Sequence, residues 1–495
     1  MNNMNVEKRL PSVTMLIAIM IIFVVVMFGS IVILELPIQL ALLLVWFVIM
    51  GFGIYLKYSY FEMERGLLKG IHEGMGATLI LIAVGALIGS WIAGGVVPTM
   101  IYFGLSIISP GIFLMAAMII CAITSLATGT SFGSAGTAGI AMMGIGESFG
   151  LPVALVAGAV LSGCYVGDKM SPLSDTTVMT ASLSNVDVFR HIKSMAFVSL
   201  PAFIIAAILY WVVGMFLMEG GGDLTIAENT MANLQDTFNI SWIMLIPAAV
   251  VVAMLIFKLP SVPVIIFGAL LGSIWAALFQ GYGIIEALGT MYTGSGVSTG
   301  IEFIDNLLDR GGITFMLDVI LLIILALGVG GLLQTIGAFK VIGDIFAKWA
   351  TSTGNLTVTT MLASFFGVFF GGAAYVSLLT GTKITEENYN RQGVSRTLLS
   401  RNVEAGGTVT TPMVPWSDGG VFMAATLGVA TLAYLPFFWY AFLVIIISLI
   451  YGYAGLFIMK KDKYEMERDK EHEEEIRGSI PGTDYTNERR LQREL

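Results

Sequence analysis

The chain has 495 residues, of which 56% are hydrophobic and only 12% are charged, and its formal net charge at pH 7 is −9. Soluble globular proteins do not reach this apolar content, so the composition excludes a soluble catalytic domain and predicts a polytopic membrane protein. A disulfide framework and a cysteine metal site are also excluded, because Cys121 and Cys164 are the only cysteines and lie in separate apolar stretches.

Apolar runs near the length needed to cross about 30 Å of hydrocarbon recur along almost the whole chain. We therefore predict an all-α transmembrane domain over residues 1–459 with about ten to twelve spans. The runs lie near 12–34, 38–56, 76–97, 111–128, 152–166, 194–218, 241–257, 261–280, 316–336, 356–380, 408–431 and 433–459.

Basic residues at the ends of these runs predict the orientation, because Lys and Arg concentrate in cytoplasmic loops. Lys8 and Arg9 precede the first run, and Lys460 and Lys461 follow the last. Both termini are therefore expected in the cytoplasm and the protein in the plasma membrane. Residues 460–495 should form a charged cytoplasmic tail that packs little against the membrane domain, while 219–240, with four acidic and no basic residues, should lie outside.

Two short segments, 185–195 and 337–350, mix basic and apolar residues at helical spacing. This pattern is typical of amphipathic helices that lie on the bilayer surface. We accordingly assign His191 to an exposed surface of the first segment.

Two stretches interrupt the apolar pattern at membrane depth. The small-residue segment 127–139 is followed by "GDKMSPLSDTT" (167–177), and the segment 366–382 is followed by "SRNVEAGGTVTTPMVPWSDGG" (400–420). The order of small residues, carboxylate, hydroxyl-proline cluster and second carboxylate is similar in both, which indicates a weak internal repeat at about 70–220 and 310–459. Interrupted helices at corresponding positions of two halves indicate a transporter binding site.

The chemistry of the interruptions favours a small cation. A broken helix survives in hydrocarbon only where protein or a water-filled cavity satisfies its backbone, so each break marks a cavity. Proline frees backbone carbonyls, and neighbouring hydroxyls add oxygens of the kind that a hard cation prefers. The predicted ion- or substrate-binding residues are Asp168, Ser171, Ser174, Asp175, Thr176, Glu404, Thr408, Thr411 and Asp418, with Thr128, Thr130 and Ser131 as supporting hydroxyls and Asp168, Ser171 and Thr411 as the Na⁺ ligands proper.

A single intramembrane carboxylate can support exchange of two cations. Removal from water favours its protonated form, whereas a bound cation favours its ionised form, so the same group holds either H⁺ or Na⁺. Asp168 is the first choice for this role and Glu404 the second. The alternative is that Lys169 forms a packing ion pair with Asp175 or Glu404 that only fixes helix register.

The two motifs together make the chain resemble the NhaC family of Na⁺/H⁺ antiporters, within the ion transporter superfamily. The string "GDKMSPLSDTT" is quite specific to that family, and the similarity covers nearly the whole membrane domain. The resemblance implies two inverted repeats whose broken or re-entrant helices meet at the membrane midplane. It also implies a secondary transporter that uses neither ATP nor a prosthetic group and has Na⁺ and H⁺ as its cargo.

The resemblance leaves the substrate open, because some members couple these ions to malate and lactate. Na⁺/H⁺ antiport is our main interpretation, and a carboxylate exchanger that uses Lys169 or Arg401 to hold the substrate is the alternative. An intramembrane aspartyl protease is a remote third hypothesis, since residues 165–168 read Tyr-Val-Gly-Asp and not Gly-x-Gly-Asp. The expected partners are membrane lipid and small ions, together with small carboxylates if the chain is a carboxylate exchanger. A homodimer with a second copy of the chain is also considered, and no nucleic acid is expected.

Overall fold

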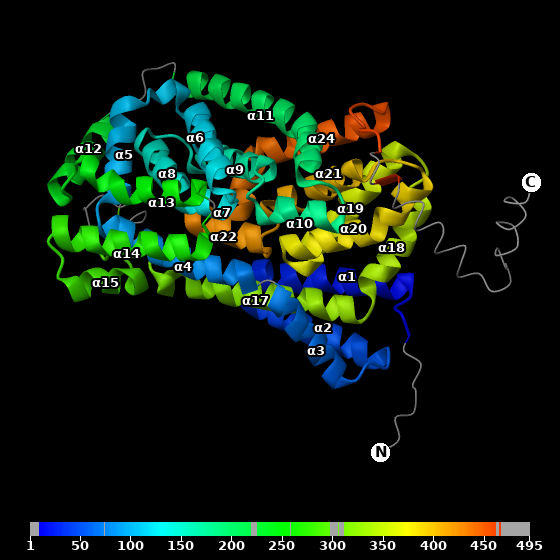
Figure 1. Cartoon of the computed structure of the whole chain (residues 1–495). Coiled ribbons are helices and arrows are strands. Elements are labelled where there is room, and N and C mark those ends of the chain that lie inside the picture. Colours follow the sequence, from blue (N-terminus) through cyan, green and yellow to red (C-terminus); the bar gives the residue numbers. More distant parts are fainter. Residues whose placement is uncertain are drawn as a thin grey trace, which may run out of the picture.

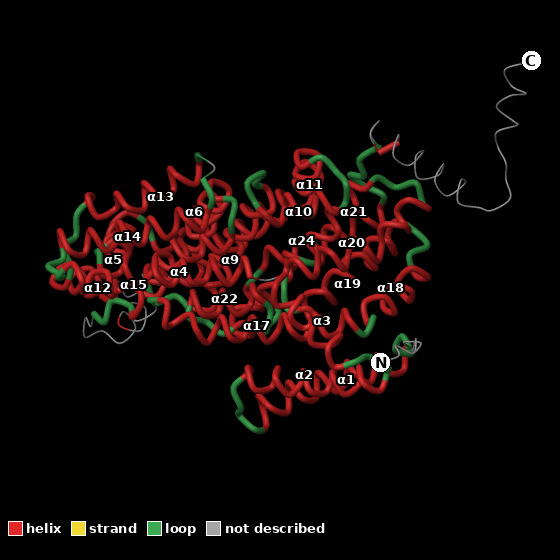
Figure 2. Tube along the Cα trace, turned by 60° about the horizontal axis from the view of Figure 1, so that its bottom comes forward, coloured by secondary structure: helices red, strands yellow, loops and turns green. Residues whose placement is uncertain are grey.

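The computed structural model describes residues 9–73, 75–218, 225–257, 259–297, 305, 311–461 and 465–466. Within these residues all regular structure is helical, as the tube in Figure 2 shows. Lys8, residues 219–224 of the predicted outside loop and most of the predicted tail 460–495 lie outside the described residues. The prediction of an all-α membrane fold is confirmed.

The helices form a bundle in which most axes run along one direction, with α12 and α15 at one end and α18 and α21 at the other (Figure 1). A helix satisfies its own backbone hydrogen bonds, which is why apolar segments in a bilayer adopt it. The bounds are α1 Val13–Phe28, α2 Ile38–Tyr55, α3 Tyr60–Glu73, α4 Met75–Ala93, α5 Val96–Ile107, α6 Phe113–Thr128, α7 Ser131–Ser134, α8 Ile140–Ser148, α9 Val153–Met170, α10 Asp175–Leu183, α11 Val188–Met218, α12 Thr225–Thr237, α13 Ile246–Ile256, α14 Ser261–Phe279, α15 Ile284–Thr293, α17 Ile313–Thr335, α18 Ala338–Trp349, α19 Thr353–Gly371, α20 Ala374–Arg391, α21 Arg396–Gly406, α22 Asp418–Leu427, α23 Thr431–Tyr434 and α24 Trp439–Ala454.

Seven described helices are long and apolar enough to cross a membrane, and three sharply bent pairs raise the number to as many as ten. The upper value meets the lower end of the predicted range. Burial separates central from peripheral helices, because 83% of the most apolar window of α9 is buried against 28% for α2 and for α11. The central helix α9 carries the first interrupted motif, so that motif lies in the interior of the bundle.

Two of the predicted spans follow a different course. The run 356–380 is not one span, since α19 ends at Gly371 and α20 begins at Ala374. The two helices pack antiparallel as a hairpin, with the Thr360 and Thr385 hydroxyls 3.3 Å apart. The run 408–431 is likewise interrupted, because a 3₁₀ segment, Thr408–Met413, precedes α22, and α22 is bent by 87° from the helix that follows. Hydropathy alone cannot distinguish a re-entrant hairpin from a span.

The two predicted surface segments have different outcomes. Residues 337–350 form the separate helix α18. Residues 188–195 instead form the start of the long helix α11, and His191 is fully buried, so its assignment to an exposed surface is wrong. The imidazole lies against α21, where its Nδ1 is 2.9 Å from the Ser400 hydroxyl.

The chain also turns back after α6, where α7 and the following π-helical segment Ala135–Gly139 pack against α6 and form a second hairpin, the first along the chain. Both hairpins turn at a glycine in the left-handed conformation. Gly129 (φ +71°) ends α6 before α7, and Gly372 (φ +69°) ends α19 before α20. L-residues with a side chain rarely adopt this conformation, and a Cβ atom at Gly129 would lie 2.6 Å from Cβ of Leu173, between α9 and α10. The first hairpin tip is therefore packed directly against the break in the neighbouring helix.

Candidate functional site

Four interruptions of the chain meet around one small cavity of about 50 Å³. They are the two hairpin tips, the segment between α9 and α10, and the segment between α21 and α22. The lining residues are Ile80, Thr130, Ser131, Phe132, Tyr165, Asp168, Lys169, Asp175, Thr176, Ala374, Tyr375, Thr408, Thr411 and Asp418. The structure thus brings together the two motifs that the sequence placed more than two hundred residues apart.

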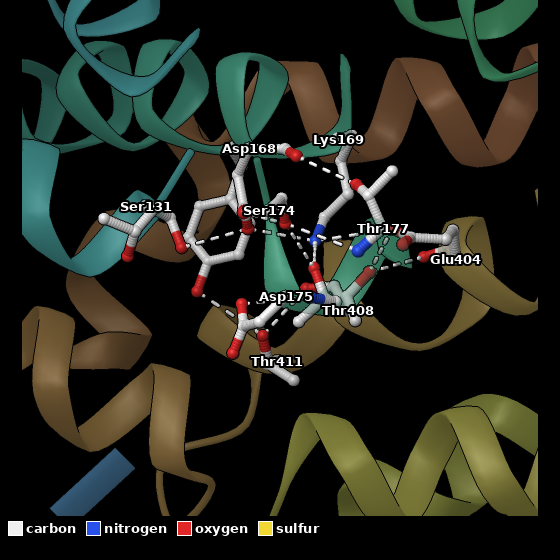
Figure 3. Close-up of polar contacts among 12 residues, drawn as sticks. Ser131, Asp168, Lys169, Ser174, Asp175, Thr177, Glu404, Thr408 and Thr411 are labelled. Carbon is white, nitrogen blue, oxygen red and sulfur yellow. Dashed lines mark hydrogen bonds and ion pairs between the residues drawn. The ribbon is translucent and has the colours of Figure 1, made fainter. Parts of the chain in front are cut away.

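Asp168 lies in the last turn of α9, with only 4% of its surface exposed. Its Oδ1 accepts a hydrogen bond from the Ser174 hydroxyl at 2.6 Å, and its Oδ2 accepts one from the Ser131 hydroxyl at 3.2 Å (Figure 3). These partners are side-chain hydroxyls, which can rotate and present a lone pair to a cation. The carboxylate is therefore held by groups that can change partner.

The Lys169 ammonium is a resident cation at the edge of the cavity. Its Nζ lies 3.0 Å from Oδ2 of Asp168, 3.3 Å from Oε2 of Glu404 and 3.1 Å from Oγ1 of Thr176. Because an ammonium group has three protons, these three oxygens use its whole donor capacity. Figure 3 shows the ammonium pointing between the α9–α10 segment and α21. Lys169 therefore joins the first motif to the second.

Glu404 lies on α21, fully buried and outside the cavity lining. Its Oε2 accepts from the Thr408 hydroxyl at 2.6 Å, and its Oε1 accepts from the Thr180 hydroxyl at 3.0 Å. The predicted pairing of Lys169 with Glu404 is present, but Lys169 also pairs with Asp168, so the pair is part of the site.

The other two carboxylates occupy matching positions in the two halves. Asp175 and Asp418 are the first residues of α10 and α22, and each follows a serine, Ser174 or Ser417, that caps its helix. Asp175 accepts from the Tyr375 hydroxyl at 2.5 Å and from a backbone N–H. Within the part of the chain that the structure describes, Asp418 accepts from backbone N–H groups alone, those of Ala374 at 3.1 Å and Gly419 at 2.7 Å.

Besides Glu404, three further predicted residues lie away from the cavity, and Ser174 reaches it only through its hydrogen bond to Asp168. Ser171 is buried and donates to the Leu126 carbonyl, and Thr128 likewise donates to backbone carbonyls behind the first hairpin tip. Arg401 is fully buried and donates to the Phe457 carbonyl at 3.0 Å, on the side of the bundle where the tail begins. Arg401 is therefore not placed to hold a substrate carboxylate in this cavity, the role that the alternative prediction gave to Lys169 or Arg401.

Sequence reasoning missed three residues of the site. Tyr375 contacts Asp175, Tyr165 lies 3.4 Å from the Thr411 hydroxyl, and His191 lies 3.8 Å from Glu404. Tyr375 sits in the small-residue stretch 366–382, where a bulky polar side chain beside glycines is a usable signal. Tyr165 and His191 carry no such local signal, because their positions follow from long-range packing.

The arrangement provides a carboxylate ringed by hydroxyls and occupied on one side by a displaceable ammonium. A hard monovalent cation prefers such an oxygen-rich environment, and the ionisable carboxylate gives protons access to the same place. The formal charges on the cavity lining are three carboxylates and one ammonium, which favours a cation over an anion.

Several known proteins are similar to this chain over most of its length. A family model described as the Na⁺/H⁺ antiporter family matches residues 163–456, which contain both interrupted motifs. The chain is 52% identical to the malate-2H⁺/Na⁺-lactate antiporter of Bacillus subtilis (strain 168), over 91% of this chain and 97% of that one. It is 35% identical to the Na⁺/H⁺ antiporter NhaC of Alkalihalophilus pseudofirmus, over 84% and 90%. It is also 35% identical to the arginine/ornithine antiporter ArcD of Halobacterium salinarum, over 82% and 84%.

Proposed function

Since the chain belongs to the Na⁺/H⁺ antiporter family, we propose that it exchanges Na⁺ for H⁺ across the plasma membrane, with the Asp168 carboxylate as the group that both cations use. Ion gradients supply the energy, and the exchange requires no cofactor. Both termini face the cytoplasm, and the cavity lies near the midplane between two inverted repeats in contact with lipid.

The observation that carries the proposal is the place of the Lys169 ammonium. A monovalent cation already lies against Asp168 and Thr176, at 3.0 and 3.1 Å. An entering Na⁺ competes with this ammonium for the same oxygens, and it needs only that Ser131 and Ser174 turn their lone pairs toward it. Thr411 contributes a further oxygen across the cavity, since its hydroxyl donates to the Thr408 carbonyl, accepts from the Tyr165 hydroxyl and keeps one lone pair available.

Protons compete at the same carboxylate. When Asp168 is protonated it carries no charge to hold Na⁺, and when Na⁺ is bound the carboxylate is stabilised in its ionised form. Each passage of the site across the membrane therefore carries either Na⁺ or H⁺. Na⁺ should consequently bind more weakly as pH falls.

Transport by the purified full chain in proteoliposomes tests this function. Addition of Na⁺ alone should dissipate an imposed pH gradient, followed with an entrapped pH-sensitive dye. Absence of any Na⁺-dependent proton movement, with or without organic acids, would overturn the proposal.

A carboxylate-coupled exchange is the second candidate, because the relative named for malate and lactate is 52% identical whereas the two relatives named NhaC are 35% and 30% identical. The geometry favours it less, since the three donors of Lys169 are occupied and Arg401 lies elsewhere. The same liposomes decide the matter when loaded with malate and supplied with lactate and Na⁺. Proton movement that requires the organic acids would replace the main interpretation with this one.

A further inference from the structure

His191 and Glu404 form a buried pair that the exchange at Asp168 does not use. Both side chains are fully buried, and His191 Nε2 lies 3.8 Å from Oε1 of Glu404. Nε2 has no hydrogen-bond partner among the described residues. A polar nitrogen without a partner is costly in a membrane interior, so its position beside a carboxylate calls for a physical reason.

The hydrogen bonds around the imidazole indicate where a proton belongs. The Ser400 hydroxyl has one proton, which it donates to the Thr397 carbonyl at 3.0 Å. With its proton placed there, the hydroxyl accepts from His191 Nδ1, 2.9 Å away, and in the neutral ring of this tautomer Nε2 carries a bare lone pair. A lone pair that faces a carboxylate oxygen is repulsive unless a proton lies between them.

We propose that Glu404 and His191 together form a second proton site, through which the proton displaced by Na⁺ leaves toward the side of the bundle where the C-terminal tail begins. This inference rests on the proposed exchange of Na⁺ for H⁺. In it, Glu404 is not a ligand of Na⁺, since it does not line the cavity and its oxygens are engaged by Lys169, Thr180 and Thr408.

The charges of Asp168, Lys169, Glu404 and His191 sum to zero at every step of this route. With Asp168 protonated and His191 neutral, Glu404 and Lys169 cancel. When that proton moves to His191, two carboxylates face two cations. Na⁺ binding at the ionised Asp168 then adds a positive charge, and loss of the same proton from His191 restores neutrality. One Na⁺ bound is thus matched by one proton released, and a buried cluster strongly favours such a balance.

The groups that face His191 from its packed neighbours fit this role. Glu404 faces it from α21, and Lys169, on α9, lies on the far side of Glu404. From α10, the facing group is the Thr180 hydroxyl, which binds Glu404. Tyr440 on α24 donates to the Ser199 hydroxyl, and Arg190 within α11 donates to the Lys460 carbonyl. Neither of these hydrogen bonds is made to the imidazole.

The His191–Glu404 pair also lies close to the surface of the protein. His191 is in the first turn of α11, between Asp187 and Lys193, which are both exposed. The hydrogen bond from Arg190 to Lys460 places this turn beside the end of the last membrane helix. A proton on His191 is therefore one helical turn from residues at the surface.

The test compares His191→Gln with His72→Gln in the reconstituted full chain, because His72 is an exposed histidine on α3 and serves as the matched control. Glutamine preserves hydrogen bonding but cannot carry a proton. We expect Na⁺-driven proton movement in H191Q to fall by about tenfold or more. Counterflow of ²²Na⁺ against Na⁺, which moves no proton, should continue, and H72Q should match wild type in both measurements.

A second measurement follows the wild-type protein itself and uses H191Q only to assign the signals. In ¹⁵N-histidine-labelled wild type, the His191 signals, identified by their loss in H191Q, should change from a protonated to a bare Nε2 when Na⁺ is added at constant pH. Three results would each overturn the second proton site. The first is coupled exchange by H191Q at the wild-type rate, the second is an Nε2 signal that does not change with Na⁺, and the third is loss of both counterflow and coupled exchange in H191Q. Failure of wild type itself to move Na⁺ in counterflow would instead overturn the proposed function.

Discussion

The two interrupted helices carry the same device but hold their carboxylates differently. In each, a serine caps a helix whose first residue is an aspartate at the cavity, Ser174–Asp175 in one half and Ser417–Asp418 in the other. The first half adds Asp168, bound by two hydroxyls and an ammonium, whereas Asp418 is bound by two backbone N–H groups. Side chains can release a carboxylate for a cation, while fixed amides cannot, so the position of Asp168 suits ion exchange and that of Asp418 suits holding the site in place. Glu404 in the second half is also held by two hydroxyls and Lys169, but it lies outside the cavity lining.

The largest effect should separate Asp168 from Asp418. Asp168→Asn removes the charge that holds Na⁺ and the group that takes up H⁺, so Na⁺/H⁺ exchange in proteoliposomes should be abolished. Asp418→Asn should retain exchange and lower the free energy of unfolding by about 1 to 3 kcal/mol, since one charged acceptor of backbone N–H groups is lost. Normal exchange by D168N, combined with none by D418N, would reverse the roles of the two halves.

Glu404→Gln tests what the second half contributes to Lys169. The change leaves a fully buried ammonium with one carboxylate instead of two. Removing one partner of a buried pair costs about 3 to 5 kcal/mol, which thermal unfolding in detergent should detect. Lys169 should also bind Asp168 more firmly, so Na⁺ affinity should fall. An unchanged melting temperature would show that Glu404 is not the anchor of the ammonium.

The two capping serines offer a matched pair. Ser174→Ala and Ser417→Ala should each destabilise the protein by about 1 kcal/mol through loss of the helix cap. Only Ser174 also donates to Asp168, at 2.6 Å, so S174A alone should weaken Na⁺ binding, by about tenfold for one hydrogen bond to a charged group. Equal Na⁺ affinities in the two variants, measured by isothermal titration calorimetry, would contradict the difference between the halves.

The smallest effect concerns the predicted ligands Thr411 and Ser171. Thr411 lines the cavity, whereas Ser171 donates to the Leu126 carbonyl behind it. Thr411→Ala should therefore lower Na⁺ affinity a few-fold without changing its pH dependence, because a hydroxyl supplies an oxygen but no titratable charge. Ser171→Ala should leave the affinity at the wild-type value, and a loss equal to that of T411A would place Ser171 among the ligands.

Much of the site was predictable because its residues are clustered in sequence. The string from Gly167 to Thr177 contains two carboxylates, an ammonium and several hydroxyls around a helix break, so its local order already defines most of one wall. The course of 356–380 was not predictable from hydropathy, since a helical hairpin and a single span have the same apolar content. Only the adjacent Gly371 and Gly372 signalled the turn.

His191 shows the complementary limit. Its local sequence, with Arg190 and Lys193 beside apolar residues, is that of a surface helix, and the prediction followed that pattern. The burial arises because α11 continues as one helix to Met218 and its first turn is pressed against α21. Arg401 is a second example. Its residue type indicated a ligand for an anion, but its guanidinium donates to the Phe457 carbonyl instead.

The glycine hairpin tips have a mechanical consequence. The tip at Gly129 is packed against Leu173, and the tip at Gly372 accepts a hydrogen bond from the Asp418 N–H at 2.8 Å, so each hairpin is fastened to the broken helix of its own half. Polar contacts also cross between the halves. Side chains make those from Lys169 to Glu404 and from Tyr375 to Asp175, and the backbone makes one from the Gly312 N–H to the Gly85 carbonyl at 2.8 Å. A cation that draws Lys169 off Asp168 therefore also disturbs a contact that joins the two halves.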